Sequence, residues 1–178
     1  ATAVLVGVSV GGMVALRAAL DWPHRVAGLV LSNTAAKIGD ADVWRARIEV
    51  VEEQGVGALA DSTLLRWFPE GFRHANEPLV NGLTNMISRT SATGYAGVSA
   101  AIATEDLRRR LHEAQTPTLV VGGSHDMSTP PPLVAELAEA LPSATLQVID
   151  DAGHLPMVDA PERFTELLQQ YLNARGTA

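Results

Sequence analysis

The sequence predicts an α/β fold in which a mostly parallel sheet alternates with helices. Four short runs rich in Val, Leu and Ile are bounded by turn residues, at 3–8, 26–31, 118–121 and 145–149. Runs that are apolar almost throughout are typical of strands buried on both faces, as in a parallel sheet. A helix-sized segment at 12–20 lies between the first two runs, and another at 131–141 lies between the last two. This alternation indicates α/β architecture.

Residues 38–112 interrupt the alternation with several helical patterns separated by Gly and Pro. Asp40 is placed to cap a helix that Gly55 ends. Further helices are expected over 58–67, 79–88 and 94–103, and a closing amphipathic helix begins with proline over 161–173. The segment is either a set of core helices or an inserted helical cap over a site. About 75 residues exceed an ordinary crossover between parallel strands, which favours the cap.

Composition narrows the class of protein. The chain has 178 residues, of which 47% are hydrophobic and 19% charged, and a chain of this length can bury about 70% of its unfolded surface in one core. Together with the helical interruption at 38–112, this predicts one core at 1–37 and 113–178, incomplete at its N-terminus, and a cap at 38–112. A net charge of −7 and no basic tract longer than Arg108–Arg110 argue against nucleic-acid and membrane partners.

The absence of cysteine excludes disulfides, thiol nucleophiles and Cys-ligated metal sites, and it fits a cytoplasmic location. The apolar stretch 1–16 is shorter than the roughly 20 residues of a membrane span. It also has no positively charged segment before it, as a signal peptide would. No ligand spacing on a common helix face is found among His24, His74, His112 and His125, so no metal site is expected.

The first apolar run ends in Gly7-Val8-Ser9-Val10-Gly11, followed by Gly12. A Gly-x-Ser-x-Gly pattern between a strand and a helix is typical of a nucleophile elbow, in which the serine lies on a sharp, strained turn. The flanking glycines are expected to avoid clashes there, and the Val10 N–H would stabilise an oxyanion. The alternative is a glycine-rich turn with an incidental serine, such as a phosphate-binding turn. A P-loop would need a following Lys, and a dinucleotide site would need Gly-x-Gly-x-x-Gly.

A serine becomes a nucleophile only beside a base that an acid orients. Asp126 follows the third predicted strand and His154 follows the fourth, and the carboxyl ends of parallel strands form the edge where α/β sheets bind ligands. The order Ser9, Asp126, His154 is that of α/β-hydrolases. Asp150 and Asp151 compete for the acid's role but are interpreted as turn residues. Asp126 as a turn residue and His154 as a helix cap are the structural alternatives.

Several stretches resemble one group within this class, the bacterial 3-oxoadipate enol-lactonases, over nearly the whole chain. They are Gly7–Met13, Leu29–Gly39, Val43-Trp44 with Arg47-Ile48, Arg66–Phe68, Gly94–Gly97 and Pro117–Gly122. The elbow and the histidine loop are common to all α/β-hydrolases. The Asn-Thr-Ala-Ala stretch at 33–36 and the residues of the expected cap are what point to the lactonases.

The resemblance implies that Ser9 attacks a lactone carbonyl, with His154 as base and then acid and Asp126 as its orienting partner. The product would be 3-oxoadipate, in aromatic-acid catabolism, and no cofactor is implied. The substrate's carboxylate would meet a cation of the cap. Trp44 with Arg47 is one candidate pair for substrate binding, and Arg66 with Trp67 is the other. Trp44 in the cap core and Arg47 as a surface charge is an equally open interpretation.

An α/β-hydrolase has further strands before the elbow, and a loop after one of them supplies the second oxyanion N–H. We expect this N-terminal part to exist as another chain or as further residues, and the strand at 3–8 to expose an apolar edge without it. The open alternatives are another small-ester hydrolase, a cofactor-free perhydrolase, or an incomplete non-catalytic fragment. A dehalogenase would need an Asp nucleophile in place of Ser9, so this class is disfavoured. The expected partner is a small lactone or ester.

Overall fold

The computed structural model describes residues 1–176 and contains a four-stranded sheet of order β1-β2-β3-β4. All three strand pairings of this sheet are parallel. The strands are β1 (Ala3–Val8), β2 (Val26–Ser32), β3 (Thr118–Gly123) and β4 (Ala144–Ile149). The predicted α/β fold with a parallel sheet is confirmed, and β2, β3 and β4 extend the predicted runs by one or two residues.

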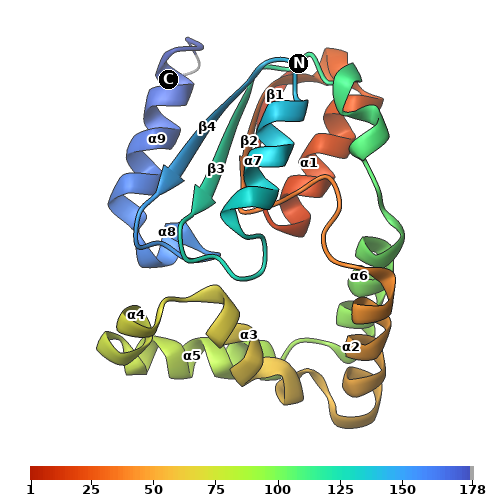
Figure 1. Cartoon of the computed structure of the whole chain (residues 1–178), viewed down its shortest axis with the longest axis vertical. Helices are drawn as coiled ribbons and strands as arrows, with labels where there is room; N and C mark the ends of the chain where they lie inside the picture. The colour runs from red at the N-terminus through yellow and green to blue at the C-terminus, as the bar shows by residue number, and fades with distance from the viewer. Residues whose placement is uncertain (177–178) are drawn as a thin grey trace.

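Helices pack on both faces of the sheet (Figure 1). On one face α1 (Val10–Asp21) and α7 (Pro131–Ala140) lie against the strands, and Leu31 of β2 belongs to that core. On the other face α9 (Pro161–Asn173) contributes Phe164 and Leu167 to a second core that contains Val30. Adjacent residues of β2 thus point to opposite cores, as the two-residue period of a strand requires.

The expectation that all four strands are buried on both faces is wrong for the edges of the sheet. Every residue of β3 is buried, whereas β1 has only half-buried and exposed residues and β4 has a single buried residue, Ile149. An edge strand has one neighbour, so its outer side and part of its face remain open. Val6 of β1 is 49% exposed, which agrees with the apolar edge expected there.

Five α-helices and two 3₁₀ turns connect β2 to β3. The α-helices are α2 (Ala41–Gln54), α3 (Ala60–Trp67), α4 (Glu70–Ala75), α5 (Glu77–Ser88) and α6 (Ala92–Thr104), and the 3₁₀ turns are η2 (Val56–Leu59) and η3 (Arg108–Glu113). In Figure 1, α3, α4 and α5 lie beyond the arrowheads of the strands, at the carboxyl edge of the sheet. The segment has its own apolar core, which includes Val51, Leu64 and Phe68.

The sequence patterns missed some short elements. The helix expected over 58–67 is divided into η2 and α3, and α4 was not predicted because its six residues carry no apolar repeat. The short helix α8 (Pro156–Asp159) and the 3₁₀ turn η1 (Pro23–Arg25) were not predicted either. Within residues 1–176, no helix combines the length and the apolar character needed to cross a membrane.

Candidate active site

Ser9 connects β1 to α1 in a strained backbone conformation, with φ 54° and ψ −123°. A Cβ on Gly7 would lie 2.2 Å from the carbonyl oxygen of Gly11, and one on Gly12 would lie 2.6 Å from the Thr34 methyl. These close approaches explain the glycines at 7 and 12. The expectation fails at Gly11, where a Cβ would meet none of the described atoms within 4 Å beyond its own helix.

Backbone hydrogen bonds hold the elbow against β2. The Ser9 N–H donates to the carbonyl oxygens of Ser32 and Asn33, at 3.0 and 3.1 Å, and the Thr34 hydroxyl donates to the Ser9 carbonyl at 2.6 Å. Although Ser9 occupies the N-cap position of α1, its side chain makes no capping hydrogen bond. Val10 is the first helical residue, where the N–H has no partner inside the helix. This turn therefore leaves both the Ser9 hydroxyl and the Val10 N–H outside the helix's own hydrogen bonds.

His154 and Asp126 form a buried pair. The Nδ1 atom of His154 lies 2.8 Å from Oδ2 of Asp126, and the two side chains are 3% and 0% exposed. The same carboxylate oxygen accepts hydrogen bonds from the Thr129 hydroxyl at 2.6 Å and the Asn33 amide at 3.0 Å. The other oxygen accepts from the backbone N–H groups of Ser128 and Thr129, at 2.7 and 3.0 Å. Asp126 is thus held from both of its oxygens.

These donors keep Asp126 ionised. Burial is the largest single influence and would raise the pKa of its carboxyl, but hydrogen bonds from His154, Thr129 and Asn33, together with the interaction with the His154 charge, outweigh it and lower the pKa below its ordinary value. An ionised carboxylate only accepts hydrogen bonds, so the His154 Nδ1 must donate. In the neutral ring the Nε2 atom is then free to accept a proton.

Asn33 connects the loops that carry these two side chains. It follows β2 directly, is fully buried and has a positive φ of 48°. Its amide donates to Asp126 and to the Gly153 carbonyl at 2.9 Å, while its own oxygen accepts from the Ser32 hydroxyl at 2.7 Å. Sequence patterns gave Asn33 no role in the site, although a polar residue in the loop after a buried strand is the signal that pointed to Asp126.

A cavity of about 350 Å³ lies between the carboxyl edge of the sheet and the helices that connect β2 to β3. Ser9, Val10 and His154 line it from the sheet side, and Asp126 lies behind His154. The four residues expected to bind substrate line it from the helical side, namely Trp44, Arg47, Arg66 and Trp67. Much of the remaining lining is apolar, including Val43, Met86, Ile87, Val98 and Ile102.

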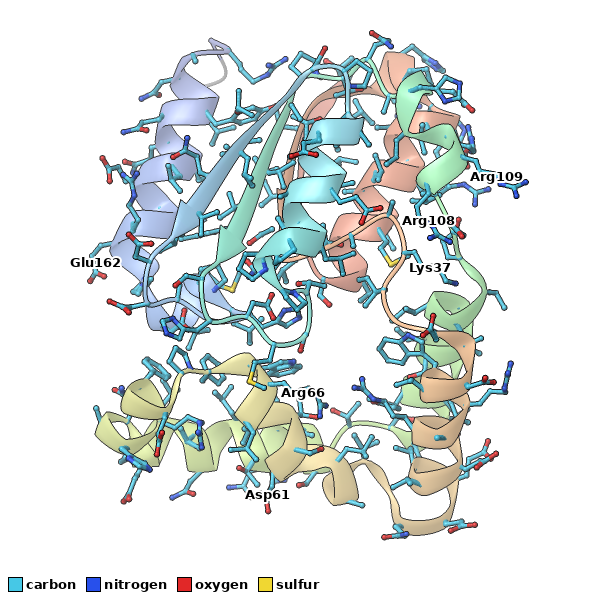
Figure 2. The ribbon with its side chains drawn as sticks, in the orientation of Figure 1. Lys37, Asp61, Arg66, Arg108, Arg109 and Glu162 are labelled. Carbon is cyan, nitrogen blue, oxygen red and sulfur yellow. The ribbon has the colours of Figure 1, made fainter. Side chains whose placement is uncertain are left out.

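The two arginines of the cavity have no carboxylate partner among residues 1–176. The Arg47 guanidinium lies 4.8 Å from the centre of the Trp44 ring, and Arg66 donates to the Thr63 hydroxyl at 3.3 Å. Burial lowers the pKa of Arg66, and the nearby charge of Arg47 lowers it further. Figure 2 shows Arg66 on the helical segment below the sheet. A ligand that carries negative charge would relieve this repulsion.

Trp44 combines the two interpretations that the sequence left open. Its indole N–H donates to the Ile38 carbonyl at 2.6 Å, and its ring packs against the apolar cluster of Met13, Ile38 and Ile102. The same side chain also lines the cavity beside Arg47. Trp44 is therefore both a packing residue and part of the cavity wall.

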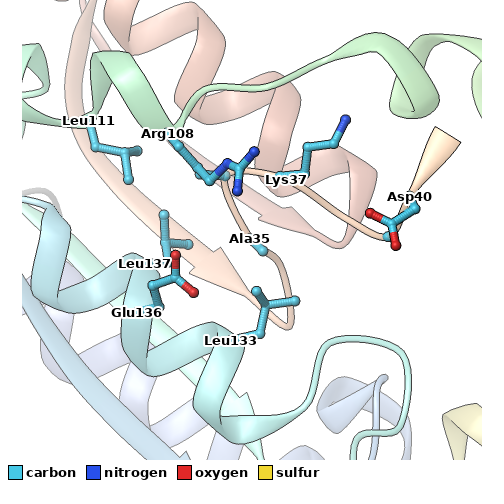
Figure 3. A pocket seen from close by; sticks show the side chains of 10 residues that line it. Ala35, Lys37, Asp40, Arg108, Leu111, Leu133, Glu136 and Leu137 are labelled. Carbon is cyan, nitrogen blue, oxygen red and sulfur yellow. The ribbon is translucent and has the colours of Figure 1, made fainter.

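Other candidate positions lie apart from the His154–Asp126 pair. Asp150 and Asp151 are exposed in the turn after β4. A smaller cavity of about 220 Å³ contains the charged residues Lys37, Asp40, Arg108 and Glu136 (Figure 3). Arg108 pairs with Asp106, and Lys37 donates to the carbonyls of Ala103 and Glu105. In the described part of the chain, no three His, Asp or Glu side chains are grouped to hold a metal ion.

A strand–serine–helix turn and a buried His–Asp pair at the carboxyl edge of a parallel sheet are the defining features of one class of α/β proteins. The chain belongs to the alpha/beta hydrolase fold family, which matches residues 1–161. The resemblance noted in the sequence is confirmed by the relatives that follow.

The chain is 34% identical to 3-oxoadipate enol-lactonase 2 of Acinetobacter baylyi, over 92% of this chain and 61% of that protein. It is 33% identical to 3-oxoadipate enol-lactonase 1 of the same organism, over 94% of this chain and 63% of the relative. The chain thus spans less than two thirds of the length of these relatives.

Two solved structures of hydrolases have closely similar folds. The enol-lactonase from Burkholderia xenovorans matches with a TM-score of 0.93 and 31% identity, over 97% of this chain and 66% of the other. A thermophilic esterase from Thermogutta terrifontis, solved with malate bound, matches with a TM-score of 0.91 and 30% identity, over 98% and 65%.

Proposed function

We propose that the protein is a carboxylic ester hydrolase in which Ser9, His154 and Asp126 act as a catalytic triad. The observation that carries the proposal is that Ser9, on its strained turn, lines the same cavity as a His154 whose far nitrogen is bound to a buried carboxylate. Hydrolases and lactonases among the relatives support the same reaction type.

In the proposed reaction, the Ser9 oxygen attacks the ester carbonyl while His154 Nε2 takes the hydroxyl proton. The carbonyl oxygen becomes an oxyanion, and the Val10 N–H donates a hydrogen bond to it. As the carbon–oxygen bond of the ester breaks, His154 returns the proton to the leaving oxygen. Water then attacks the acyl-enzyme while His154 takes one of its protons, the bond between the acyl carbon and the Ser9 oxygen breaks, and His154 returns the proton to Ser9 as the acid is released. Asp126 stabilises the positively charged imidazole at both steps.

The proposed substrate is a small carboxylated lactone, 3-oxoadipate enol-lactone, which would open to 3-oxoadipate. Its ester carbonyl would lie at Ser9 while its carboxylate meets Arg47 and Arg66, which have no carboxylate partner among residues 1–176. The apolar lining would hold the carbon skeleton. In this proposal residues 38–112 act as a cap that provides the charge selection, and 1–37 with 113–178 provide the chemistry. An esterase relative solved with malate also held a small carboxylate.

A small neutral ester is the second candidate substrate. The cavity has a largely apolar lining, and the esterase relative has a TM-score nearly as high as the enol-lactonase. The two candidates differ in whether the arginines contribute to turnover.

A fluorophosphonate probe tests the proposed chemistry, because it reacts covalently only with an activated serine. We expect the intact mass of the purified protein to rise by one probe adduct, and the adduct to be absent in Ser9→Ala. Hydrolysis of the enol-lactone, followed by the loss of its absorbance, then tests the substrate. An unmodified wild-type mass would contradict the activated serine and leave the chain as a non-catalytic member of its family.

A further inference from the structure

The end of α3 contacts both loops that carry the proposed acid and base. The carbonyl oxygen of Arg66 accepts a hydrogen bond from the Met127 N–H at 3.2 Å, directly after Asp126. The carbonyl oxygen of Trp67 accepts one from the His154 N–H at 2.7 Å. The last carbonyls of a helix have no partner inside it. Here the last two carbonyls of α3 are used to hold the loops after β3 and β4.

The Trp67 side chain makes a second contact with the same histidine. Its indole ring stacks on the His154 imidazole, with ring centres 6.0 Å apart and an angle of 27° between the planes. This separation lies within the usual range for ring pairs. Asp126 binds one nitrogen of the imidazole, and a hydrogen bond to one nitrogen leaves the ring able to rotate about that contact. The indole supports the face of the ring and restricts that rotation.

Gly153 shows how closely the helix end and the histidine loop approach. A Cβ at this position would lie 2.0 Å from the carbonyl oxygen of Trp67 and 3.1 Å from Oδ2 of Asp159. The φ of Gly153 lies outside the left-handed region, so an L-residue fits the backbone angle. The glycine is needed because the Trp67 carbonyl occupies the space of a side chain.

We propose that Trp67 is a positioning residue that holds the His154 ring in its reactive orientation, and that the end of α3 is a fixed part of the catalytic site. The proposal rests on the proposed function of Ser9 and His154. It differs from the expected role of Trp67 in substrate binding, because a residue that acts through His154 changes turnover with every ester, whatever charge the ester carries.

The contacts of the α3 terminus limit which part of the helical segment is free to move. Displacing the end of α3 would break the hydrogen bonds from the His154 and Met127 N–H groups, together with the ring stack. Any opening that admits substrate must therefore leave the α3 terminus in place. Misplacement of a catalytic group by about 1 Å costs about 10²-fold in rate, so a loosened α3 is expected to reduce turnover.

The first test compares turnover of a small neutral ester, p-nitrophenyl acetate, in three tryptophan variants. Trp67→Leu is expected to lower kcat by about 10- to 100-fold with KM changed by less than about threefold, because the ester is too small to depend on the indole. Trp67→Phe keeps a ring against His154 and is expected to restore most of kcat. The matched control is Trp22→Leu, at a tryptophan that is 57% exposed and outside the cavity, and it is expected to behave as wild type.

The second test acts on the backbone contact. Gly153→Ala is expected to push the α3 terminus away, which lowers kcat and speeds hydrogen–deuterium exchange in peptides covering 60–67, 124–130 and 150–156 together. The matched control is Gly82→Ala on α5, where a Cβ would meet no described atom within 4 Å beyond its own helix. This control is expected to leave exchange in those peptides unchanged.

The outcomes separate the two proposals. If the wild-type protein shows no turnover that depends on Ser9, the proposed function is wrong and the positioning role fails with it. If wild type, Trp67→Phe and Trp67→Leu turn over the ester equally while remaining folded, the positioning role alone is wrong. A variant that changes only KM would likewise overturn it and return Trp67 to a substrate contact.

Discussion

The polar groups on the two sides of the cavity differ in how completely they are paired within the protein. On the sheet side, the carboxylate of Asp126 accepts hydrogen bonds at both oxygens, and Asn33 uses its amide and its carbonyl. On the helical side, Arg47 and Arg66 line the same cavity without a carboxylate among the described residues. Satisfied buried groups are held in one geometry. Arginines without a carboxylate partner are available to an anionic ligand.

In the proposed function, this difference separates the chemistry at Ser9 from the recognition of the substrate's charge. Removing one partner from a buried, satisfied network leaves others unpaired, at a cost of about 1–3 kcal/mol per group. Arg47 and Arg66 have no carboxylate partner among the described residues, so removing either one leaves no charged group of the protein unpaired. Changes on the sheet side should therefore affect every substrate, and changes on the helical side only substrates that carry negative charge.

The largest effect is expected on the sheet side, from Asp126→Asn. An amide cannot stabilise the charged imidazole and favours the wrong His154 tautomer, which in a serine triad costs about 10⁴-fold in kcat. The measurement is kcat on both a neutral and a carboxylated ester, with circular dichroism to establish that the variant is folded. Equal losses for the two esters are expected, and a folded variant that loses less than about tenfold would remove Asp126 from the triad.

An intermediate effect is expected on the helical side, from Arg47→Leu and Arg66→Leu. Each should lower kcat/KM for the carboxylated lactone by about 10- to 100-fold, the value of a hydrogen bond to a charged group, and leave a neutral ester unchanged. Arg45→Leu is the matched control, because Arg45 also lies on α2 but pairs with Asp42 and does not line the cavity. Equal losses on both esters would show that the arginines serve folding, not recognition.

The smallest effect concerns two aspartates with opposite pKa shifts. Hydrogen bonds lower the pKa of Asp126 against the effect of burial, so its contribution to stability is present above the unfolded value of about 3.9 and is lost as pH falls through the folded pKa. Burial raises the pKa of Asp159, whose Oδ1 is buried without a hydrogen-bond partner, and the Asp126 charge raises it further. Its contribution is greatest below the unfolded value and is lost as pH rises through the folded pKa.

Melting temperatures measured from pH 3 to pH 8 check both signs. Asp159→Asn should remove a small loss of stability that wild type shows as pH rises from about 4. Asp126→Asn should weaken the decline of wild type at acid pH. The loss of melting temperature between acid and neutral pH should be smaller in Asp159→Asn than in wild type. A larger loss in the variant would show that the direction assigned to the pKa of Asp159 is wrong.

Much of the fold and of the site could be predicted because the signals are local. The apolar runs predicted the four strands, and the Gly-x-Ser-x-Gly pattern predicted the strained turn at Ser9. Asp126 and His154 could be proposed as acid and base from the sequence because each follows a strand of the same sheet. The contacts of Asn33 with Asp126 and Gly153 could not be predicted, since they join residues 93 and 120 positions apart. No local pattern encodes such a distance.

The sequence by itself determined that Ser9, Asp126 and His154 each follow a strand of one parallel sheet, and therefore that they gather at its carboxyl edge. Only the tertiary structure decided how they are held. It placed the end of α3 against the His154 loop, set Asn33 between the loops after β3 and β4, and left Arg47 and Arg66 facing the cavity. The reason is physical. Residue type and strand position depend on neighbours along the chain, whereas hydrogen-bond partners and ring stacking depend on packing between segments that are distant in sequence.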